Sequence, residues 1–428
     1  MKNSGAVIPL PLYKGINMNF KVLIIILLII IYAYGLLVKY LRLQSCNNAL
    51  PANVADVYDA ATYEKWRAYR REKVRLSIWE STVALIVDVA LIAFNLYAEF
   101  AGLFPDKVEP QIFAVLLLTT LSSIATIPFT YYDTMRIEEK YGFNRTKAKT
   151  FWADQIKEFI ISLGILFFLT WILSLLHRWL HDWMIVAFAG FLVAFILLFL
   201  FLYPVFSRIF NKFTPLEEGE LRDKLTELLT SHGYNVRAIE VMDASKRTAK
   251  ANAYFTGFGK MKTIVLFDTL LEKLTPDEIC AVFAHELGHG LNKDTLKSQL
   301  MNTLQMCILS VLAWLTLRTT AIFTNCGFDK INYGFAVILI MAVEFALIAP
   351  LYSILVNYFS RSHEYRADRQ AVSEGYGEAL ISGLKKLTKT DFGDVAPSPA
   401  LILLEFSHPS LSQRIEAIER ELAKGHKQ

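Results

Sequence analysis

The sequence predicts a mainly α-helical, multi-pass membrane protein with seven spans and a small α+β segment on the cytoplasmic side. Hydrophobic residues make up 54% of the 428 residues and the mean hydropathy is +0.36, which is too apolar for an ordinary soluble protein. The apolar residues lie in long runs, each near or above the roughly 17–25 residues that cross a bilayer. The seven runs are residues 22–38, 79–103, 111–131, 157–177, 183–206, 302–323 and 332–356.

The charges of the loops predict the orientation of the spans. Lysine and arginine are frequent after the first and third runs. Lys107 is alone between the second and third runs, and Arg178 is alone between the fourth and fifth. Because cytoplasmic loops are enriched in these residues, we expect the C-terminus in the cytoplasm and the N-terminus outside. Lysines near the N-terminus argue against an outside location for it: Lys2, Lys14 and Lys21.

The apolar runs divide the chain into four expected parts. These are 1–207 with spans one to five, 208–300 with short strands and a motif-bearing helix, 301–358 with spans six and seven, and 359–428 with cytoplasmic helices. In the second part we expect an amphipathic helix from Leu216 to Ser231, which Gly233 ends. Strands are expected at 239–242, 251–255 and 263–267.

The pentapeptide His285-Glu286-Leu287-Gly288-His289 is the strongest chemical signal in the chain. Positions i and i+4 of a helix share one face, so His285 and His289 can bind one Zn²⁺. Glu286 would lie beside them and take a proton from the attacking water. The alternative is a chance occurrence of the pattern on a buried helix.

The residues around the pentapeptide favour a helix. Thr275 is a predicted N-cap, Pro276 suits the first helical position, and Glu278 completes a capping box. Gly288 and Gly290 weaken the helix, and we expect them to let another backbone or a substrate come close.

A zinc ion held by two histidines needs a third protein ligand, and Glu364 is our candidate. It would open a helix that enters the cytoplasm from the last span, with Asp368 one turn later on the same face. Asp368 could then accept the second N–H of a ligand histidine. From spacing alone, it is about equally consistent that Glu364 and Asp368 form an exposed charged face of the helix after the last span. His363 also competes, although it points to a different face of the helix.

The chain resembles the Ste24-type CAAX prenyl proteases of the M48 metallopeptidases over essentially its whole length. Besides the pentapeptide and the pair Glu364 and Asp368, the matching residues are 252–255, 264–271, 138–144, His408-Pro409 and Arg414. The resemblance implies a zinc metalloendopeptidase with one Zn²⁺ per chain, held by His285, His289 and Glu364.

The resemblance also implies roles for residues that the spacing leaves unassigned. Asn252 and His408 would lie over the substrate strand and steady the tetrahedral intermediate. Arg414 would support His408 or bind the substrate terminus. Without the resemblance, Asn252 is typical of a strand-end turn and His408 of a surface position beside a helix.

Polar residues within the apolar runs indicate either a chamber or a buried network. Asp88, Asn95 and Glu99 recur on one predicted helix face, and Glu344 lies in the middle of the last run. Ionisable groups at membrane depth usually face the bundle interior or a cavity. A chamber lining and an inter-helix hydrogen-bond network explain this pattern equally well.

The expected function is therefore zinc-dependent cleavage of peptide bonds, near the C-terminus of prenylated proteins or peptides. The first alternative is a quality-control zinc endopeptidase of membrane proteins without a prenyl requirement, an HtpX-like role. The second is a channel or transporter whose histidines are incidental. We expect a monomer in a bacterial inner membrane or the endoplasmic reticulum, with its active site facing the cytoplasm or a chamber.

Two further classes are disfavoured by composition. The formal net charge of +4 comes from the loops, and no basic patch with stacking aromatics suggests nucleic-acid binding. The four cysteines form no C-x-x-C pair, so we expect free thiols: Cys46, Cys280, Cys307 and Cys326.

Overall fold

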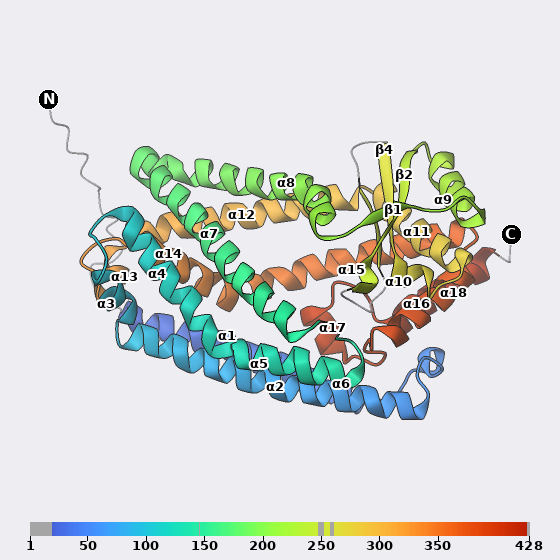
Figure 1. The fold of residues 1–428 in the computed structure, drawn as a ribbon, viewed down its shortest axis with the longest axis horizontal. Helices are drawn as coiled ribbons and strands as arrows, with labels where there is room; N and C mark the ends of the chain where they lie inside the picture. Colours follow the sequence, from blue (N-terminus) through green and yellow to red (C-terminus); the bar gives the residue numbers. More distant parts are fainter. Residues whose placement is uncertain (1–18, 145, 247–251, 257–260, 426–428) are drawn as a thin grey trace.

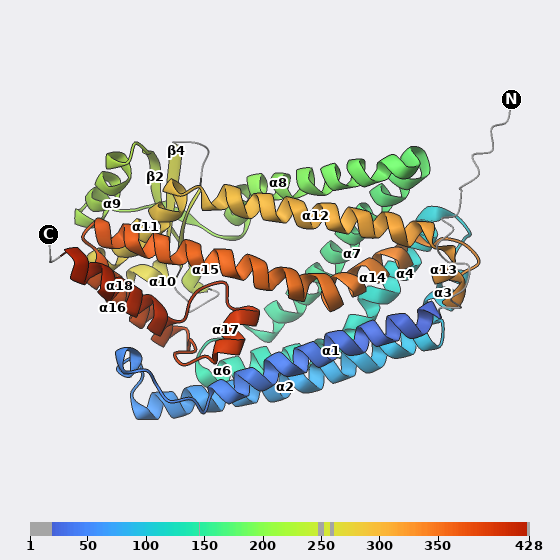
Figure 2. The ribbon, with the colours of Figure 1, turned by 180° about the vertical axis from the view of Figure 1, so that it is seen from behind.

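The structure is a computed structural model that describes residues 19–144, 146–246, 252–256 and 261–425 (Figure 1). It is mainly helical, as the sequence predicts. Long helices run side by side along the molecule, and the strands are gathered at one end together with the C-terminal helices (Figures 1 and 2).

The helices follow one another with short connections. The first half holds α1 (Phe20–Ser45), α2 (Ala60–Ala93), α3 (Leu96–Gly102), α4 (Val108–Ser122), α5 (Ile127–Tyr132), α6 (Glu139–Tyr141), α7 (Ala148–Leu180) and α8 (Met184–Phe210). The second half holds α9 (Glu220–Ser231), α10 (Asp268–Leu271), α11 (Pro276–Leu291), α12 (Asp294–Arg318), α13 (Thr320–Asn325), α14 (Tyr333–Val343), α15 (Ala349–Ser373), α16 (Gly377–Thr390), α17 (Pro399–Glu405) and α18 (Leu411–Gly425). Short 3₁₀ turns are η2 (Ala52–Val54), η3 (Ser123–Thr126), η5 (His181–Trp183) and η6 (Ala244–Lys246), and π-helical turns are η4 (Asp133–Glu138) and η7 (Glu344–Ile348).

Six continuous helical segments in the described residues are long and apolar enough to cross a bilayer, so the predicted count of seven is wrong by this measure. The segments are Phe20–Ser45, Ala60–Ala93, Val108–Tyr141, Ala148–Phe199, Asp294–Arg318 and Tyr333–Ser373. The fourth segment contains two of the predicted spans, because α7 and α8 are joined through η5 without a loop. The chain reverses there at His181, whose φ is 48°.

The predicted polar stripe of the second span is wrong, because the helix breaks. Asn95 separates α2 from α3 with a left-handed φ of 56°, a conformation that asparagine tolerates better than most residues. Asp88 and Glu99 therefore belong to different helices. Gly327 packs so closely on Asn95 that a Cβ there would lie 3.0 Å from the Asn95 Cβ.

Glu344, predicted in the middle of the last span, is buried in η7 and accepts a hydrogen bond from Gln305 of α12 at 2.6 Å. A contact between two helices therefore accounts for one oxygen of this carboxylate. Asp88 lies instead along a cavity that α1, α2, α3, α4, α14 and η7 line together.

The small sheet has the strand order β1-β2-β4-β3, with β2 and β4 parallel and the other pairs antiparallel. The strands are β1 (Phe213–Pro215), β2 (Asn235–Met242), β3 (Ala253–Thr256) and β4 (Met261–Phe267). The three predicted strands are confirmed, although residue 251 lies outside the described residues. The three-residue β1 gave no recognisable pattern. β3 forms one edge of the sheet.

The α11 helix begins as the sequence predicts. The backbone N–H of Glu278 donates to the Thr275 hydroxyl at 3.4 Å, and the Glu278 carboxylate accepts from the Thr275 N–H at 2.8 Å. Apolar side chains of α9, the sheet, α11, α16 and α18 form one core around this helix. Its fully buried members include Leu225, Ile264, Leu266, Phe283, Leu287 and Leu380.

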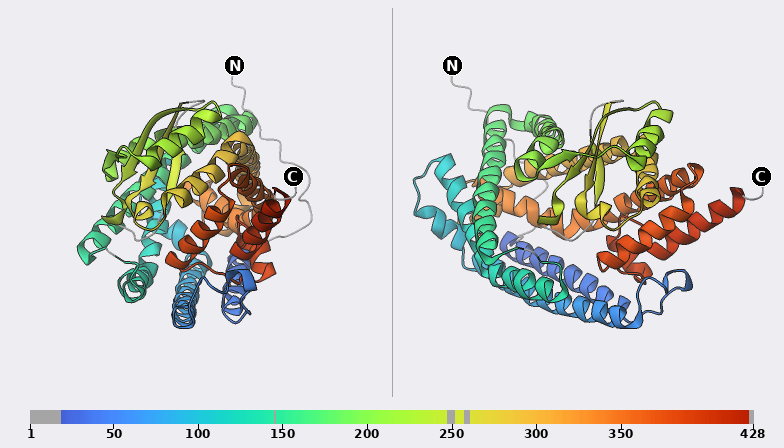
Figure 3. Two further views of the ribbon diagram at one scale, coloured as in Figure 1. Left: turned by 90° about the vertical axis from the view of Figure 1, so that its right-hand side faces the viewer. Right: turned by 45° about the vertical axis from the view of Figure 1, so that its right-hand side comes forward.

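The loop after α1 and the C-terminal helices meet at the same end of the molecule as the sheet (Figure 3). The indole N–H of Trp66 donates to the backbone oxygen of Phe392 at 3.0 Å, and both residues belong to one buried cluster. Asn53 donates to the backbone oxygen of Ser412 at 2.9 Å. These contacts hold α18 beside the membrane helices.

Candidate metal centre

The α11 and α15 helices cross closely at Gly288, between the two histidines of the pentapeptide. A Cβ at Gly288 would lie 2.7 Å from the Cα of Ala367 and 3.0 Å from the Cβ of Gln370. No real Cβ contact is that short, so only glycine allows this approach. The prediction that Gly288 admits another backbone is confirmed.

This crossing brings together His285, His289 and Glu364, whose nearest ligand atoms all lie within 4.8 Å of one another. Nε2 of His285 is 3.5 Å from Glu364 Oε2, and Nε2 of His289 is 3.3 Å from Glu364 Oε1. Tetrahedral zinc with ligands at roughly 2.0–2.2 Å separates its ligand atoms by roughly 3.3–3.6 Å. The two distances between histidine nitrogens and Glu364 oxygens lie in this range.

The other ring nitrogen of each histidine is held by a carboxylate. Nδ1 of His285 donates to Asp368 at 2.9 Å, and Nδ1 of His289 donates to Asp294 at 3.2 Å. Because an ionised carboxylate only accepts, the proton lies on Nδ1 and the lone pair on Nε2. Both lone pairs are then available on the side of Glu364.

The sequence predicted the role of Asp368 but missed Asp294. Asp294 is the first residue of α12, five residues after His289, and its side chain is 5% exposed. Its carboxylate also accepts from Arg366 at 2.8 Å and from Lys297 at 3.1 Å. An acidic residue just beyond the motif helix was the only hint of this role in the sequence. The turn at Lys293, with φ 55°, directs the Asp294 side chain back toward His289.

An unpartnered oxygen supports the fit to a metal ion. Among the described residues, Oε2 of Glu364 is buried and has no hydrogen-bond donor. A buried carboxylate oxygen without a donor is costly. The Arg414 guanidinium, 3.4 Å away, offsets part of its charge, and a bound metal ion would supply the missing bond. The donor set of two imidazoles and one carboxylate is one that zinc takes in hydrolytic sites.

Arg414 contacts the carboxylates of α15 rather than His408. Its guanidinium donates twice to Asp368, at 2.6 and 3.0 Å, and lies 3.4 Å from Oε2 of Glu364. Burial alone would lower the pKa of Arg414, but Asp368 and Glu364 outweigh it and raise the pKa. Arg414 is therefore a permanent positive charge beside two acidic side chains.

Neighbouring carboxylates also raise the pKa of His289. Burial lowers its pKa, but Glu364 and Asp294 more than offset that effect, so the pKa lies above the ordinary value. This negative surround favours any cation at the ring, either a proton or a metal ion.

His408 and Asn252 differ in how close they lie to the cluster. Nε2 of His408 is 3.4 Å from Oε1 of Glu364, and its side chain is 62% exposed, so it lies at the rim of the site. Asn252 precedes the edge strand β3, and its amide oxygen accepts from the Ala253 N–H at 2.8 Å. In the described ranges, the structure gives Asn252 no contact with the cluster.

Glu286 lies on the next position of α11 and is half-buried. Within the described part of the chain, its carboxylate has no hydrogen-bond partner, which leaves it free to accept a proton. His363, the competing ligand candidate, is 3.7 Å from Asp294 and takes no place in the three-residue group.

The prediction that Glu364 opens a helix is wrong. Glu364 lies well inside α15, which continues from the last span to Ser373. The boundary expected at 358 falls within this helix. The cysteines are free in the described residues, as predicted, and burial raises the pKa of Cys280 to about 11.

Comparisons with known proteins agree with this geometry. Residues 39–212 match the family described as CAAX prenyl protease N-terminal, five membrane helices, and residues 215–422 match peptidase family M48. The chain is 29% identical to CAAX prenyl protease 1 of Saccharomyces cerevisiae over 94% of this chain and 96% of that protein. It is 30% identical to CAAX prenyl protease 1 homolog of Arabidopsis thaliana, over 87% of this chain and 91% of that protein.

A solved structure is also similar. The crystal structure of S. mikatae Ste24p matches with a TM-score of 0.87 and 26% identity, covering 94% of this chain and 100% of that chain. The match includes both the membrane helices and the segment that carries the His-His-Glu group. The chain therefore belongs to the CAAX prenyl proteases of peptidase family M48 and is an integral membrane metalloendopeptidase.

Proposed function

We propose that this protein uses one zinc ion, held by His285, His289 and Glu364, to hydrolyse peptide bonds near the C-terminus of prenylated proteins. The observation that carries the proposal is the convergence of Nε2 of both histidines on the two Glu364 oxygens, at 3.5 and 3.3 Å. Zinc bound there supplies a Lewis acid that polarises a carbonyl and makes water acidic enough to attack near neutral pH.

Glu286 acts as the general base. It follows His285 on the same helix and has a free carboxylate among the described residues. It takes the proton of the attacking water and returns it to the nitrogen of the leaving amine. Arg414 and Asp368 position this chemistry, since they fix the His285 ring and the Glu364 carboxylate.

His408 and Asn252 stabilise the negative charge that develops on the substrate carbonyl oxygen. The rim position of His408, 3.4 Å from Glu364, suits a donor to that oxygen. A well-placed donor of this kind stabilises the transition state by roughly 2.7–4 kcal/mol. Asn252 flanks the edge strand β3, which can pair with an extended substrate and carry its backbone to the site.

The substrate proposal comes from the relatives, whose names state that they are prenyl proteases. The location of the site supports the cytoplasmic side. The group of His285, His289 and Glu364 is carried by α11 and α15, at the same end of the molecule as the C-terminal helices (Figure 2). At this end the basic segment after α1 packs against the C-terminal part of the chain. Positive residues mark cytoplasmic loops, so we place the site there.

A cleavage assay tests the function. The purified protein in lipid nanodiscs should cut a prenylated C-terminal peptide, and a zinc chelator should abolish the cleavage. Glu286→Gln should retain about one zinc per chain but lose roughly a hundredfold or more in kcat, because only the general base is removed. Undiminished turnover by Glu286→Gln, or turnover that survives chelation, would contradict the proposal.

A further inference from the structure

His408 lies on the segment 406–410, which joins α17 to α18 and belongs to neither helix. Its side chain is 62% exposed, so packing around the ring does not fix its position. Nδ1 lies 2.9 Å from the Ser407 hydroxyl, and Nε2 lies 3.4 Å from Glu364. A ring this exposed stays beside Glu364 only if the backbone that carries it is held in place.

Arg361 of α15 holds the backbone just before His408. Its Nη1 donates to the backbone oxygen of Phe406 at 2.7 Å and to that of Ile402 at 3.0 Å. Carbonyls at the end of a helix lack partners within the helix, and bonds from a charged donor are among the stronger ones in proteins. Two residues of chain span at most roughly 7 Å, so a shift of the Phe406 carbonyl moves His408 as well.

The same helix holds the backbone just after His408. Arg414 of α18 donates to Asp368 of α15 at 2.6 and 3.0 Å. Arg361, Glu364 and Asp368 follow one another at spacings of three and four residues, so they share one face of α15. The α15 helix therefore carries the candidate metal ligand and also fixes the chain on both sides of His408.

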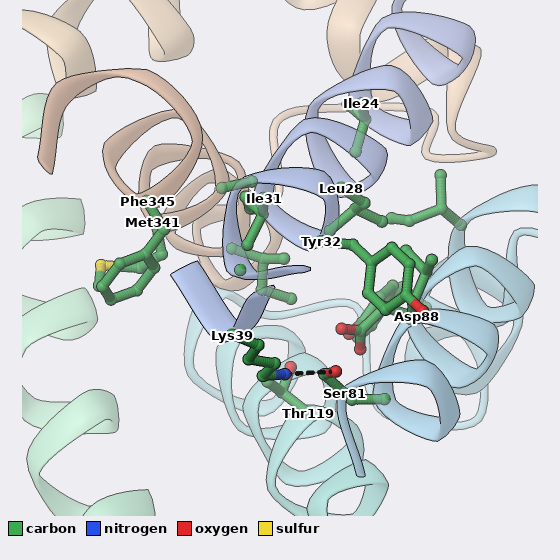
Figure 4. A pocket seen from close by; sticks show the side chains of 17 residues that line it. Ile24, Leu28, Ile31, Tyr32, Lys39, Ser81, Asp88, Thr119, Met341 and Phe345 are labelled. Atoms are coloured by element: carbon green, nitrogen blue, oxygen red, sulfur yellow. Dashed lines mark hydrogen bonds between the residues drawn. The ribbon is translucent and has the colours of Figure 1, made fainter. Parts of the chain in front are cut away.

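The α17 helix has contacts that do not involve Arg361. At its beginning, the Ser398 N–H donates to the hydroxyl of Ser45 in α1 at 3.1 Å. The α1 helix is fixed on α2 in turn, because Lys39 donates to Ser81 at 2.7 Å (Figure 4). The effect of Arg361 is therefore concentrated at the end of α17 and on the segment that follows it.

We propose that Arg361 is a positioning residue that keeps His408 beside Glu364 by holding the Phe406 backbone. The inference rests on the proposed function, because it requires His408 to donate to the substrate carbonyl oxygen. Arg361 affects the reaction only through the place of that donor. A reacting group misplaced by about 1 Å can cost roughly a hundredfold in rate.

Arg361→Met tests the inference, since it keeps the apolar stem of the side chain and removes its donors. With a prenylated peptide and protein in lipid nanodiscs, kcat should fall roughly 10–100-fold, because a misplaced donor weakens binding of the transition state. KM should stay within about twofold of the wild-type value, and the zinc content should be unchanged. Arg361→Lys keeps a charged donor and should recover part of the loss in kcat.

Arg42→Met is the matched control. Arg42 of α1 pairs with Glu405, the last residue of α17, but the Arg42 side chain is 45% exposed, and exposed pairs contribute little. This variant removes an arginine contact from the same helix and leaves the Phe406 carbonyl bound. Its kcat should stay near wild type. An equal loss of kcat in Arg42→Met and Arg361→Met, or no loss in Arg361→Met, overturns the inference.

Combining Arg361→Met with His408→Ala separates positioning from a general structural effect. If Arg361 acts through His408, the double variant should have the kcat of His408→Ala alone, within about twofold. Independent effects multiply, so a multiplied loss of kcat overturns the inference. If Arg361→Met does not fold or does not bind zinc, the same comparison is made with Arg361→Lys.

Backbone hydrogen exchange distinguishes failure of this inference from failure of the proposed function. If the wild-type protein cuts no peptide, or if His408→Ala keeps the full rate, the proposed function of the site is wrong. The exchange of residues 406–412 then decides whether Arg361 holds the segment. These amides should exchange roughly tenfold faster in Arg361→Met, while those of α11 should keep the wild-type rate. Unchanged exchange at 406–412 overturns the positioning by Arg361, whatever the protein cleaves.

Discussion

Asp294 accepts a hydrogen bond from Nδ1 of His289 at 3.2 Å, although the two residues belong to different helices. The bond fixes the ring so that Nε2 faces Glu364. Arg366 and Lys297 hold the same carboxylate from two further directions. Asp294 therefore orients His289, a proposed metal ligand, without contacting the Nε2 atom that would bind the metal.

Asp294→Ala should weaken zinc binding by roughly 10–100-fold, the usual effect of removing the partner of a ligand histidine. Competition with a chelator of known affinity measures this directly. Asp294→Asn retains an acceptor oxygen and should recover part of the loss. Asp223→Asn on the exposed face of α9 is the control, and an Asp294→Ala protein with wild-type affinity would refute the role.

Gly288→Ala should separate α11 from α15. The added Cβ would lie 2.7 Å from the Ala367 backbone, so one helix must shift and carry its ligands away from the other. We expect a lower thermal midpoint and a loss of zinc together. Gly164→Ala, with no atom within 4 Å, should change neither. Full zinc content in Gly288→Ala would show that the crossing tolerates the methyl group.

Arg414→Met should destabilise the site by about 3–5 kcal/mol, because it leaves the buried Asp368 carboxylate without its charged partner. Asp368 is 2% exposed and Arg414 is 11% exposed, so water compensates little. Thermal unfolding and zinc content together measure the effect. Arg420→Gln serves as the control, since Arg420 is 66% exposed. Equal behaviour of the two variants would contradict this assignment.

Glu278 should give a pH-dependent contribution to stability. Burial raises its pKa, but hydrogen bonds from Lys386, Ser382 and the Thr275 backbone outweigh burial and lower the pKa below the ordinary 4.5. A depressed carboxyl pKa stabilises the fold above its unfolded value and loses this effect as the pH falls through its folded value.

Glu278→Gln should therefore lower the thermal midpoint at pH 7, by the equivalent of roughly 1 kcal/mol for a lost capping interaction. The difference from wild type should shrink as the pH falls below 4.5. Glu227→Gln on the exposed side of α9 should show no such trend. A pH-independent difference would mean that packing, and not charge, accounts for the effect.

Local sequence signals predicted the parts of the fold that depend on neighbouring residues. The capping box of Thr275 and Glu278 and the three longer strands rest on such signals, and the structure contains them. The close approach at Gly288 was also predictable. A glycine inside a helix destabilises the helix, which indicates that another part of the structure requires the missing side chain.

Features that depend on distant contacts were not predictable. Nothing in the sequence marks Asn95 as a helix break, since neither proline nor glycine is nearby, and the close packing of Gly327 on Asn95 is a tertiary contact. The resemblance implied that Arg414 supports His408 or binds the substrate terminus, and nothing in the sequence pointed to its bond with Asp368, 46 residues away. Asp294 was missed because the turn at Lys293 sets its direction.

The most direct test of the account is a zinc-edge anomalous difference map of the crystallised protein. We expect one peak per chain, about 2.0–2.2 Å from Nε2 of His285, Nε2 of His289 and one oxygen of Glu364. The peak should be absent from crystals of Glu364→Ala. No peak at this site in zinc-saturated protein, or a peak bound by other residues, would contradict the account.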